Sequence, residues 1–353
     1  MNGKSKVIKI GNRLIGDMQP LFIIAEVGVT CNYDMELSKK LIDVVKESGA
    51  DAIKFIFWFP DELLSDRTAT FTYDTPSGEK KTENMISMLS KLVFSLDQWR
   101  EIKQYAAERD VILFSTINTP SGVTLARQLQ LDAFKLSSWD YNCFPLWQEL
   151  ARERKPMLID TGPVELLDVA KVMNIMHSAG NEDVVLLHCY KTTDYREINM
   201  KAIPYMRSAF GVLSGFSSTG QESDMDLLAV GLGACVLEKR LTISRSLPGH
   251  HQVLAKEPAE FKAYVKSMRN AHDALGVYAL KPSPKDLSER KKSFRRIVAN
   301  CDLPQGSVLS EKNLACKRPE EGGVSPEFFS LFLGRTLKRP VVENEAIQWE
   351  DLG

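Results

Sequence analysis

Eight short runs rich in β-branched and aromatic residues recur along the chain, and each is followed by a longer segment with helical spacing of apolar residues. The runs occupy residues 21–25, 51–57, 111–114, 133–136, 156–160, 184–188, 212–216 and 234–238. Amphipathic segments such as 35–49 and 96–110 separate them. The glycine patterns GxGxxG and GxxxxGK[ST] of nucleotide-binding open sheets do not occur. The sequence therefore predicts an α/β fold, a (β/α)8 TIM barrel.

Further segments are expected below the barrel and after it. Residues 6–16 contain two alternating runs around a Gly-Asn turn, which predicts a hairpin that plugs the bottom of the barrel. A last amphipathic helix is expected over residues 257–276, so we assign residues 1–280 to the barrel. Residues 281–292 are rich in proline and charge and are interpreted as a linker, and residues 293–353 are interpreted as a separate small domain.

Composition excludes several classes of partner. The 353 residues include 45 Lys and Arg against 46 Asp and Glu, so we expect no nucleic acid and no anionic membrane as the main partner. The N-terminus lacks the apolar core of a secretory signal, and no stretch approaches the ~20 apolar residues of a membrane span, so we expect a cytoplasmic protein. The six cysteines show no zinc-site spacing, and most are expected to be buried free thiols.

Polar residues gather where the predicted strands end, which is the position of the active site in a parallel barrel. They are Glu26, Lys54, Thr116, Lys135, Ser138, Asp160, His188, Ser217, Glu238, Lys239 and Arg240. Two lysines, an arginine and several hydroxyls suit one small ligand that carries both a phosphate and a carboxylate. The alternative is that each cation forms only a solvated ion pair at the rim, which contributes little.

Nine runs, in order, carry a resemblance to a known family: IIAEVGVTCN, GADAIKF, FSTINTPSG, FKLSS, KPMLIDTG, LLHCY, GFSST, GACVLEKRLT and LPGHH. Together they resemble the N-acetylneuraminate (sialic acid) synthases, with their spore coat polysaccharide, legionaminic and pseudaminic acid relatives. Residues 293–353, with the run CKRPEEGGVSP, resemble the SAF (antifreeze-like) domain that ends those enzymes. The resemblance covers essentially the entire chain.

This resemblance implies a transferase that condenses phosphoenolpyruvate with an aldose-type sugar to form a 3-deoxy-2-keto sugar acid. It implies that phosphoenolpyruvate is bound by five residues of the mouth: Lys54, Thr116, Lys135, Ser138 and Ser217. Glu26 matches the acidic residue near the sugar and Glu238 the glutamate of an E-[KR]-H-F-T run, and both are implied to be catalytic. Gly249-His250-His251 stands where the family has a G-P-D-H run, and His251 is the candidate there for a contact with the sugar. In the family the arginine of the KRP run reaches into the mouth of a neighbouring subunit. The resemblance therefore implies a domain-swapped homodimer in which Arg318 contacts the sugar bound by the other subunit.

The chain departs from the family where a divalent cation would bind. The resemblance implies one histidine ligand in a G-x-S-D-H run and one in an E-[KR]-H-F-T run. This chain has Ser217-Ser218-Thr219 and Glu238-Lys239-Arg240 at those places. A guanidinium has no free lone pair, so we expect no metal ligand set and no cofactor, and the Mn2+ or Mg2+ of the family is not carried over.

Two hypotheses follow from this loss. In the first, Arg240 is catalytic and supplies the positive charge that the metal would have placed beside the sugar carbonyl oxygen. In the second, the chain is a non-catalytic or diverged homologue that binds sugar or phosphate. His250 and His251 are candidates for relocated ligands or acid-base groups, although a packed loop pair is the plainer interpretation. His188 is interpreted either as part of a polar barrel layer or as a proton carrier.

Overall fold

The computed structural model describes residues 6–318 and 322–353, and the chain divides into two compact units between Gly276 and Val277. The stretch interpreted as a linker contains a helix, α11 (Pro284–Ser293). Its first turn is closed by a capping box in which Ser283 and Asp286 exchange hydrogen bonds. The boundary thus lies a few residues earlier than the predicted end of the barrel at residue 280.

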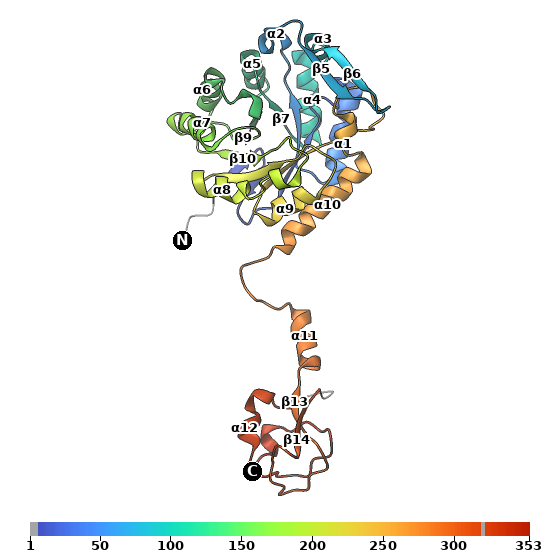
Figure 1. The fold of residues 1–353 in the computed structure, drawn as a ribbon, viewed down its shortest axis with the longest axis vertical. Helices are drawn as coiled ribbons and strands as arrows, with labels where there is room; N and C mark the ends of the chain where they lie inside the picture. Colours follow the sequence, from blue (N-terminus) through green and yellow to red (C-terminus); the bar gives the residue numbers. More distant parts are fainter. Residues whose placement is uncertain (1–5, 319–321) are drawn as a thin grey trace. The chain divides into compact units, whose positions relative to one another are not determined.

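The first unit is a closed, parallel, eight-stranded barrel (Figure 1). Its strands are β3 (Phe22–Glu26), β4 (Ala52–Ile56), β7 (Ile112–Thr116), β8 (Phe134–Leu136), β9 (Met157–Asp160), β10 (Val184–His188), β11 (Leu213–Ser217) and β12 (Val236–Arg240). Each strand pairs with the next in the chain, and β12 pairs with β3 to close the barrel. All eight predicted runs form strands, so the predicted TIM barrel is confirmed.

Helices surround the strands (Figure 1). They include α1 (Met35–Ser48), α4 (Leu96–Glu108), α5 (Pro120–Gln128), α6 (Phe144–Arg152), α7 (Leu166–Ser178), α8 (Ala202–Phe210), α9 (Asp224–Gly231) and α10 (Pro258–Ala274). In α1 the Asp34 carboxylate caps the first turn, and Gly49 ends the helix with a left-handed φ of 77°. Within residues 6–318 and 322–353 we find no helix with the length and apolar character that a membrane crossing needs.

Side chains alternate between the two faces of the barrel wall, as the period of two along a strand requires. In β3, Phe22 and Ile24 join the apolar cluster inside the barrel, whereas Ile23 and Ala25 join the cluster under the outer helices. The inner cluster also contains Ile8, Ile10 and Ile15 of the hairpin β1 (Val7–Ile10) and β2 (Arg13–Gly16). The predicted bottom plug is therefore confirmed.

An insertion between β4 and α4 was not predicted. It comprises α2 (Pro60–Leu63), the antiparallel hairpin β5 (Thr70–Asp74) and β6 (Lys80–Asn84), and α3 (Met85–Leu89). The β6 sequence KKTEN has no alternating apolar pattern, so nothing in it predicts a strand. The rings of Phe71 and Tyr73 pack against His250, with centroids 5.5 and 5.7 Å away.

The second unit has an apolar core of its own. Strands β13 (Arg296–Ala299) and β14 (Leu314–Lys317) pair antiparallel, and α12 (Phe329–Phe332) follows. The core consists of Ile297, Ala299, Leu303, Leu309, Leu314, Val324, Phe332, Leu337, Val341 and Ile347. Arg339 joins Asp351 and Glu345 through close ion pairs, which holds the C-terminal turn in place.

Three of the six cysteines, Cys31, Cys189 and Cys235, are buried free thiols. Cys143 and Cys301 are exposed and Cys316 is half-buried. The expectation that most cysteines are buried was therefore wrong for half of them. Those exceptions lie in a loop and in the small second unit, where there is less interior to occupy.

Candidate active site

A layer of polar side chains lies directly above the apolar interior of the barrel, at the carboxyl ends of the strands. Its members are Glu26, Lys54, Thr116, Lys135, Asp160, Ser217, Glu238 and Arg240. Each lies on the inward-facing side of its strand: Glu26 is two residues beyond Ile24, and Thr116 is two residues beyond Phe114. We call this end of the barrel the mouth. The site residues predicted on these strands are thus brought together.

Six of these side chains form one chain of ion pairs with alternating sign, which we call the charge chain. In order they are Asp160, Lys135, Glu238, Lys54, Glu26 and Arg240. Lys135 Nζ lies 2.9 Å from Asp160 Oδ2 and 3.0 Å from Glu238 Oε2. Lys54 Nζ lies 3.5 Å from Glu238 Oε1 and 3.3 Å from Glu26 Oε1. The charges are mutually paired, as buried charges must be.

Glu26 is held at the Arg240 end of the charge chain. The Gly28 amide donates to Glu26 Oε1 at 2.7 Å, and Arg240 Nε lies 3.5 Å from Glu26 Oε2. A Cβ at Gly28 would lie 2.3 Å from Ile56 Cγ1 and 2.7 Å from Glu26 Oε1, so only glycine allows this approach. Arg240 also donates to the Thr219 carbonyl, which fixes the guanidinium toward Glu26. Glu26 Oε2 itself accepts no hydrogen bond from the described residues.

The pKa values in the charge chain reflect burial opposed by neighbouring charge. For Glu26, burial opposes ionisation, but Lys54 and Arg240 outweigh it and the pKa is lowered. For Glu238, Lys135 and Lys54 likewise outweigh burial and lower the pKa. At Asp160 burial prevails over Lys135, so its pKa is raised. Lys135 is buried, but Asp160 and Glu238 raise its pKa and keep it protonated.

Hydroxyls complete the mouth. Lys54 Nζ donates to Thr116 Oγ1 at 3.2 Å, and Ser217 Oγ is 3.5 Å from Glu238 Oε1. Ser138 lies two residues after the end of β8, at the start of a short helical turn. Its side chain is buried and packs closely against Gly162. All five residues predicted to bind phosphoenolpyruvate thus lie at strand ends of the mouth, and their binding roles remain predictions.

The three histidines near the mouth differ in what they can do. His188 lies in the outward register, between the inward Leu187 and the loop, and its Nε2 is 2.7 Å from the Ile198 carbonyl. It therefore belongs neither to an inward polar layer nor to a proton path in the mouth. Burial lowers the pKa of His250 to about 4, and burial together with Arg240 holds that of His251 well below its ordinary value. Both imidazoles are neutral near pH 7.

The prediction that all three polar residues at the end of β12 face the mouth was wrong for Lys239. It lies between the inward Glu238 and Arg240, and the alternation turns it outward. Its Nζ is 2.9 Å from Asp226 Oδ2 on α9 and 2.6 Å from Ser218 Oγ. Tyr264 on α10 donates to Asp226 Oδ1 at 2.7 Å. This buried cluster ties β12 to two outer helices.

Arg318 lies in the second unit, directly after β14, and its side chain is exposed. Its action in a neighbouring subunit remains a prediction. The sequence analysis placed Asp160 at the mouth without assigning it a role, and it missed Asp140. Asp140 follows Ser138 in the turn η1 (Ser138–Asp140), and burial raises its pKa to about 6.

The donor set does not fit a divalent cation. Among residues 6–318 and 322–353, no three His, Cys, Asp or Glu side chains converge as a metal site would require. Every carboxylate of the charge chain has a lysine or arginine within 4 Å. Arg240 occupies the place of one expected ligand and would repel a cation there.

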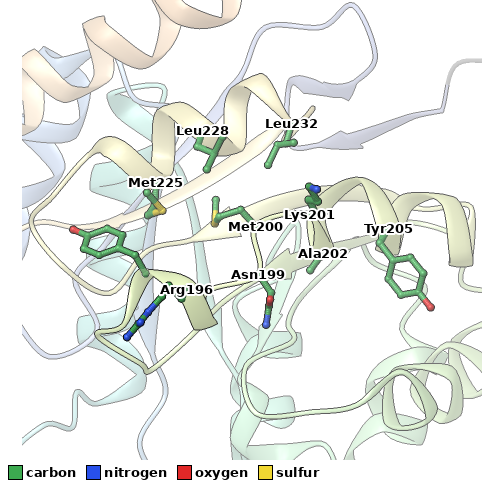
Figure 2. A pocket seen from close by; sticks show the side chains of 10 residues that line it. Arg196, Asn199, Met200, Lys201, Ala202, Tyr205, Met225, Leu228 and Leu232 are labelled. Atoms are coloured by element: carbon green, nitrogen blue, oxygen red, sulfur yellow. The ribbon is translucent and has the colours of Figure 1, made fainter.

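A cavity lies away from the charge chain, between α8, α9 and the loop after β10. It measures about 740 Å3 and is mainly apolar. Its walls comprise Tyr195, Arg196, Asn199, Met200, Lys201, Ala202, Tyr205, Met225, Leu228 and Leu232 (Figure 2). None of the predicted site residues lines this cavity, so its size does not make it the candidate active site.

Two family models match the chain. The NeuB family model matches residues 41–279, and the SAF domain model matches residues 294–353. The second match confirms the predicted SAF domain at the C-terminus.

Individual relatives match over nearly their full length. The N,N'-diacetyllegionaminic acid synthase of Campylobacter jejuni is 30% identical, over 94% of this chain and 100% of its own. The human N-acetylneuraminate-9-phosphate synthase is 28% identical, over 96% of this chain and 94% of its own. The crystal structure of spore coat polysaccharide biosynthesis protein spsE from Bacillus subtilis is 28% identical, covers 99% of both chains and has a TM-score of 0.67.

The raised pKa of Asp140 predicts a stability that rises as the pH falls. Its pKa of about 6 exceeds the ordinary 3.8, so the folded state holds the proton more tightly than the unfolded state does. The cost of the buried carboxylate is full above pH 6 and is relieved between pH 6 and 4. Asp140→Asn should therefore stabilise the protein by about 1–3 kcal/mol at pH 8, and by about half as much at pH 5.

Urea unfolding at both pH values measures this effect. Asp273→Asn, at an exposed position of α10, is the control. If Asp140→Asn raises the free energy of unfolding equally at pH 8 and pH 5, the raised pKa does not belong to the Asp140 carboxyl.

Proposed function

Because the chain belongs to the NeuB family, we propose that it is a sialic acid synthase-like transferase that condenses phosphoenolpyruvate with an aldose-type sugar. The named relatives are synthases of legionaminic, pseudaminic and phosphorylated neuraminic acids, which supports a nonulosonate or surface-polysaccharide product. In the reaction, C3 of the enol forms a bond to the aldehyde carbon of the open-chain sugar. Water adds at C2, and phosphate leaves, so the products are a 3-deoxy-2-keto sugar acid and inorganic phosphate.

The charge chain is the observation that carries this proposal. Lys54 and Lys135 are fixed, buried cations on neighbouring parts of the mouth, and Thr116, Ser138 and Ser217 add hydroxyl donors beside them. A phosphate and a carboxylate on one small ligand need this combination of fixed charge and directed hydrogen bonds. The acidic partners Glu26 and Glu238 orient the two lysines, so the ligand meets a site whose side chains are already ordered.

Arg240 and Glu26 are assigned to the acceptor sugar. The guanidinium of Arg240 can donate two directed hydrogen bonds to the aldehyde oxygen as it gains negative charge. Glu26 Oε2, which lacks a hydrogen-bond donor among the described residues, can accept from a sugar hydroxyl or from the attacking water. His251, neutral near pH 7, is assigned to the sugar as well.

We expect substitution of either lysine to weaken phosphoenolpyruvate binding. Lys54→Met and Lys135→Met each remove a charged hydrogen bond, which corresponds to about 1.5–3 kcal/mol, measured by titration calorimetry. Since each change also leaves buried carboxylates unpaired, Lys54→Arg and Lys135→Arg, which keep the charge, are made beside them. Unchanged affinity in both methionine variants would remove the mouth as the phosphoenolpyruvate site.

Activity measurements with an Arg240 variant distinguish an active enzyme from a homologue that only binds sugar or phosphate. Because we find no metal ligand set among the described residues of the mouth, phosphate release from phosphoenolpyruvate and a panel of aldoses should be unaffected by EDTA. Arg240→Ala should reduce that rate at least about 100-fold, the usual loss for one oxyanion-type donor, while circular dichroism shows that the barrel is still folded. One tightly held metal per chain, with activity lost to EDTA, would contradict this role and favour His250 or His251 as ligands.

We also propose that the enzyme is a domain-swapped homodimer in which Arg318 contacts the sugar in the partner's mouth. Arg318 is exposed and follows β14 in a unit with its own core, which suits a residue that acts in trans. Mixing Arg318→Ala with Lys54→Met should then restore activity, since one mixed site keeps both residues. A monomer in light scattering, or no recovery on mixing, would refute the proposal.

A further inference from the structure

Trp139 and Lys191 meet at the rim of the mouth. Trp139 lies in the turn η1 directly after β8, and Lys191 lies three residues after the end of β10. Lys191 Nζ is 5.7 Å from the centroid of the Trp139 indole, within the range of a cation–π contact. The indole is 67% exposed, which is unusual for so large an apolar side chain. The pair therefore presents an ordered cation and an aromatic surface to solvent.

Lys191 differs from the other cations of the mouth. Lys54, Lys135 and Arg240 each have a carboxylate oxygen within 4 Å. In the part of the chain that the structure describes, Lys191 forms no ion pair, and its Nζ has no hydrogen-bond acceptor. Its charge is thus available to a ligand without first breaking an internal contact.

Lys191 lies at the same end of the barrel as the mouth, because its loop follows the carboxyl end of β10. Together with Arg240 and Lys54, Lys191 disfavours protonation of His251. Its charge also acts on the Cys189 thiol, as do those of Asp160 and Lys135.

The charge chain itself is electrically balanced. It contains three cations and three carboxylates, so it offers no surplus positive charge. A phosphomonoester carries about −1.5 to −2 charges at pH 7. Transfer of such a group from water into a balanced, largely buried site costs free energy unless a further cation offsets the charge. Lys191, which forms no ion pair among the described residues, is a cation at this end of the barrel that can offset the charge.

We propose that Lys191, held over Trp139, is the residue that receives a phosphomonoester group at the rim of the mouth. The inference rests on the proposed function in taking the mouth as the substrate site. The group belongs either to phosphoenolpyruvate or to a phosphorylated acceptor sugar, since both present the same dianion. Trp139 is a positioning residue, because its ring restrains the lysine and shields one side of it from water.

The experiment compares Lys191→Met with Lys39→Met by titration calorimetry on the full-length protein. Lys39 is a matched control, since its Nζ lies 5.7 Å from the Tyr105 ring centroid but on outer helix α1. The probes are phosphoenolpyruvate, N-acetylmannosamine 6-phosphate and N-acetylmannosamine. Lys191→Met should weaken binding of the phosphorylated ligand that uses this subsite about 10- to 100-fold, as expected for one charged hydrogen bond. Lys39→Met should leave every affinity unchanged.

The affinities of Lys191→Met distinguish the two possible sources of the phosphate group, which are phosphoenolpyruvate and a phosphorylated sugar. Weakening confined to phosphoenolpyruvate assigns the subsite to the donor, and weakening confined to the sugar phosphate assigns it to the acceptor. Trp139→Ala should show part of the same loss, and Trp139→Phe should restore it. If Lys191→Met binds all three probes as Lys39→Met does, the inference is overturned while the proposed function stands. If the wild-type protein binds the sugar phosphate through Lys191 but does not bind phosphoenolpyruvate, the proposed function fails and the Lys191 subsite stands. If the wild-type protein binds neither phosphorylated ligand, both the proposed function and the subsite are overturned.

Discussion

Buried charge has to be paired, and this requirement organises the upper half of the barrel. An unpaired carboxylate or ammonium in a low-dielectric interior costs several kcal/mol, so each charged group of the mouth needs a partner of opposite sign within a few ångströms. Parallel strands in a closed barrel bring inward residues of neighbouring strands to the same height. Glu26, Lys54, Lys135, Asp160 and Glu238 satisfy one another because the barrel closes between β12 and β3. The apolar plug below keeps water out from the other end.

Much of this arrangement could be predicted from the sequence because it follows from local periodicity. The strand runs alternate with amphipathic segments, and the polar residue at the end of each run marks the height of the mouth. The hairpin under the barrel was predicted for the same reason, since Ile8, Ile10 and Ile15 alternate with polar residues around a Gly-Asn turn. Where a pattern of period two or 3.6 exists, both the element and its inward face can be deduced from it.

The features that the sequence did not predict depend on tertiary contacts. Lys239 looks like a mouth residue in the run EKR, and only the register of β12 shows that it faces Asp226 and Tyr264. In the β5–β6 hairpin only β5 has alternating aromatic residues, and its partner β6 is polar throughout, so no apolar period marks the second strand. The raised pKa of Asp140 results from burial, which a loop sequence does not reveal. Lys191 and Trp139 lie 52 positions apart, and they become neighbours because β8 and β10 flank β9 in the sheet.

Two buried ion-pair groups in the same molecule show why burial alone does not identify a functional site. In the cluster outside the barrel, both carboxylate oxygens of Asp226 are bonded, one to Lys239 and one to Tyr264, so every acceptor is satisfied within the fold. In the mouth, Glu26 Oε2 and Asp160 Oδ1 accept no hydrogen bond from the described residues. Each open acceptor costs about 1–3 kcal/mol, and a ligand that donates a hydrogen bond to it removes that cost. Asp160 begins the charge chain and Glu26 lies next to Arg240 at its other end, so an open acceptor for a ligand that donates a hydrogen bond is found toward each end.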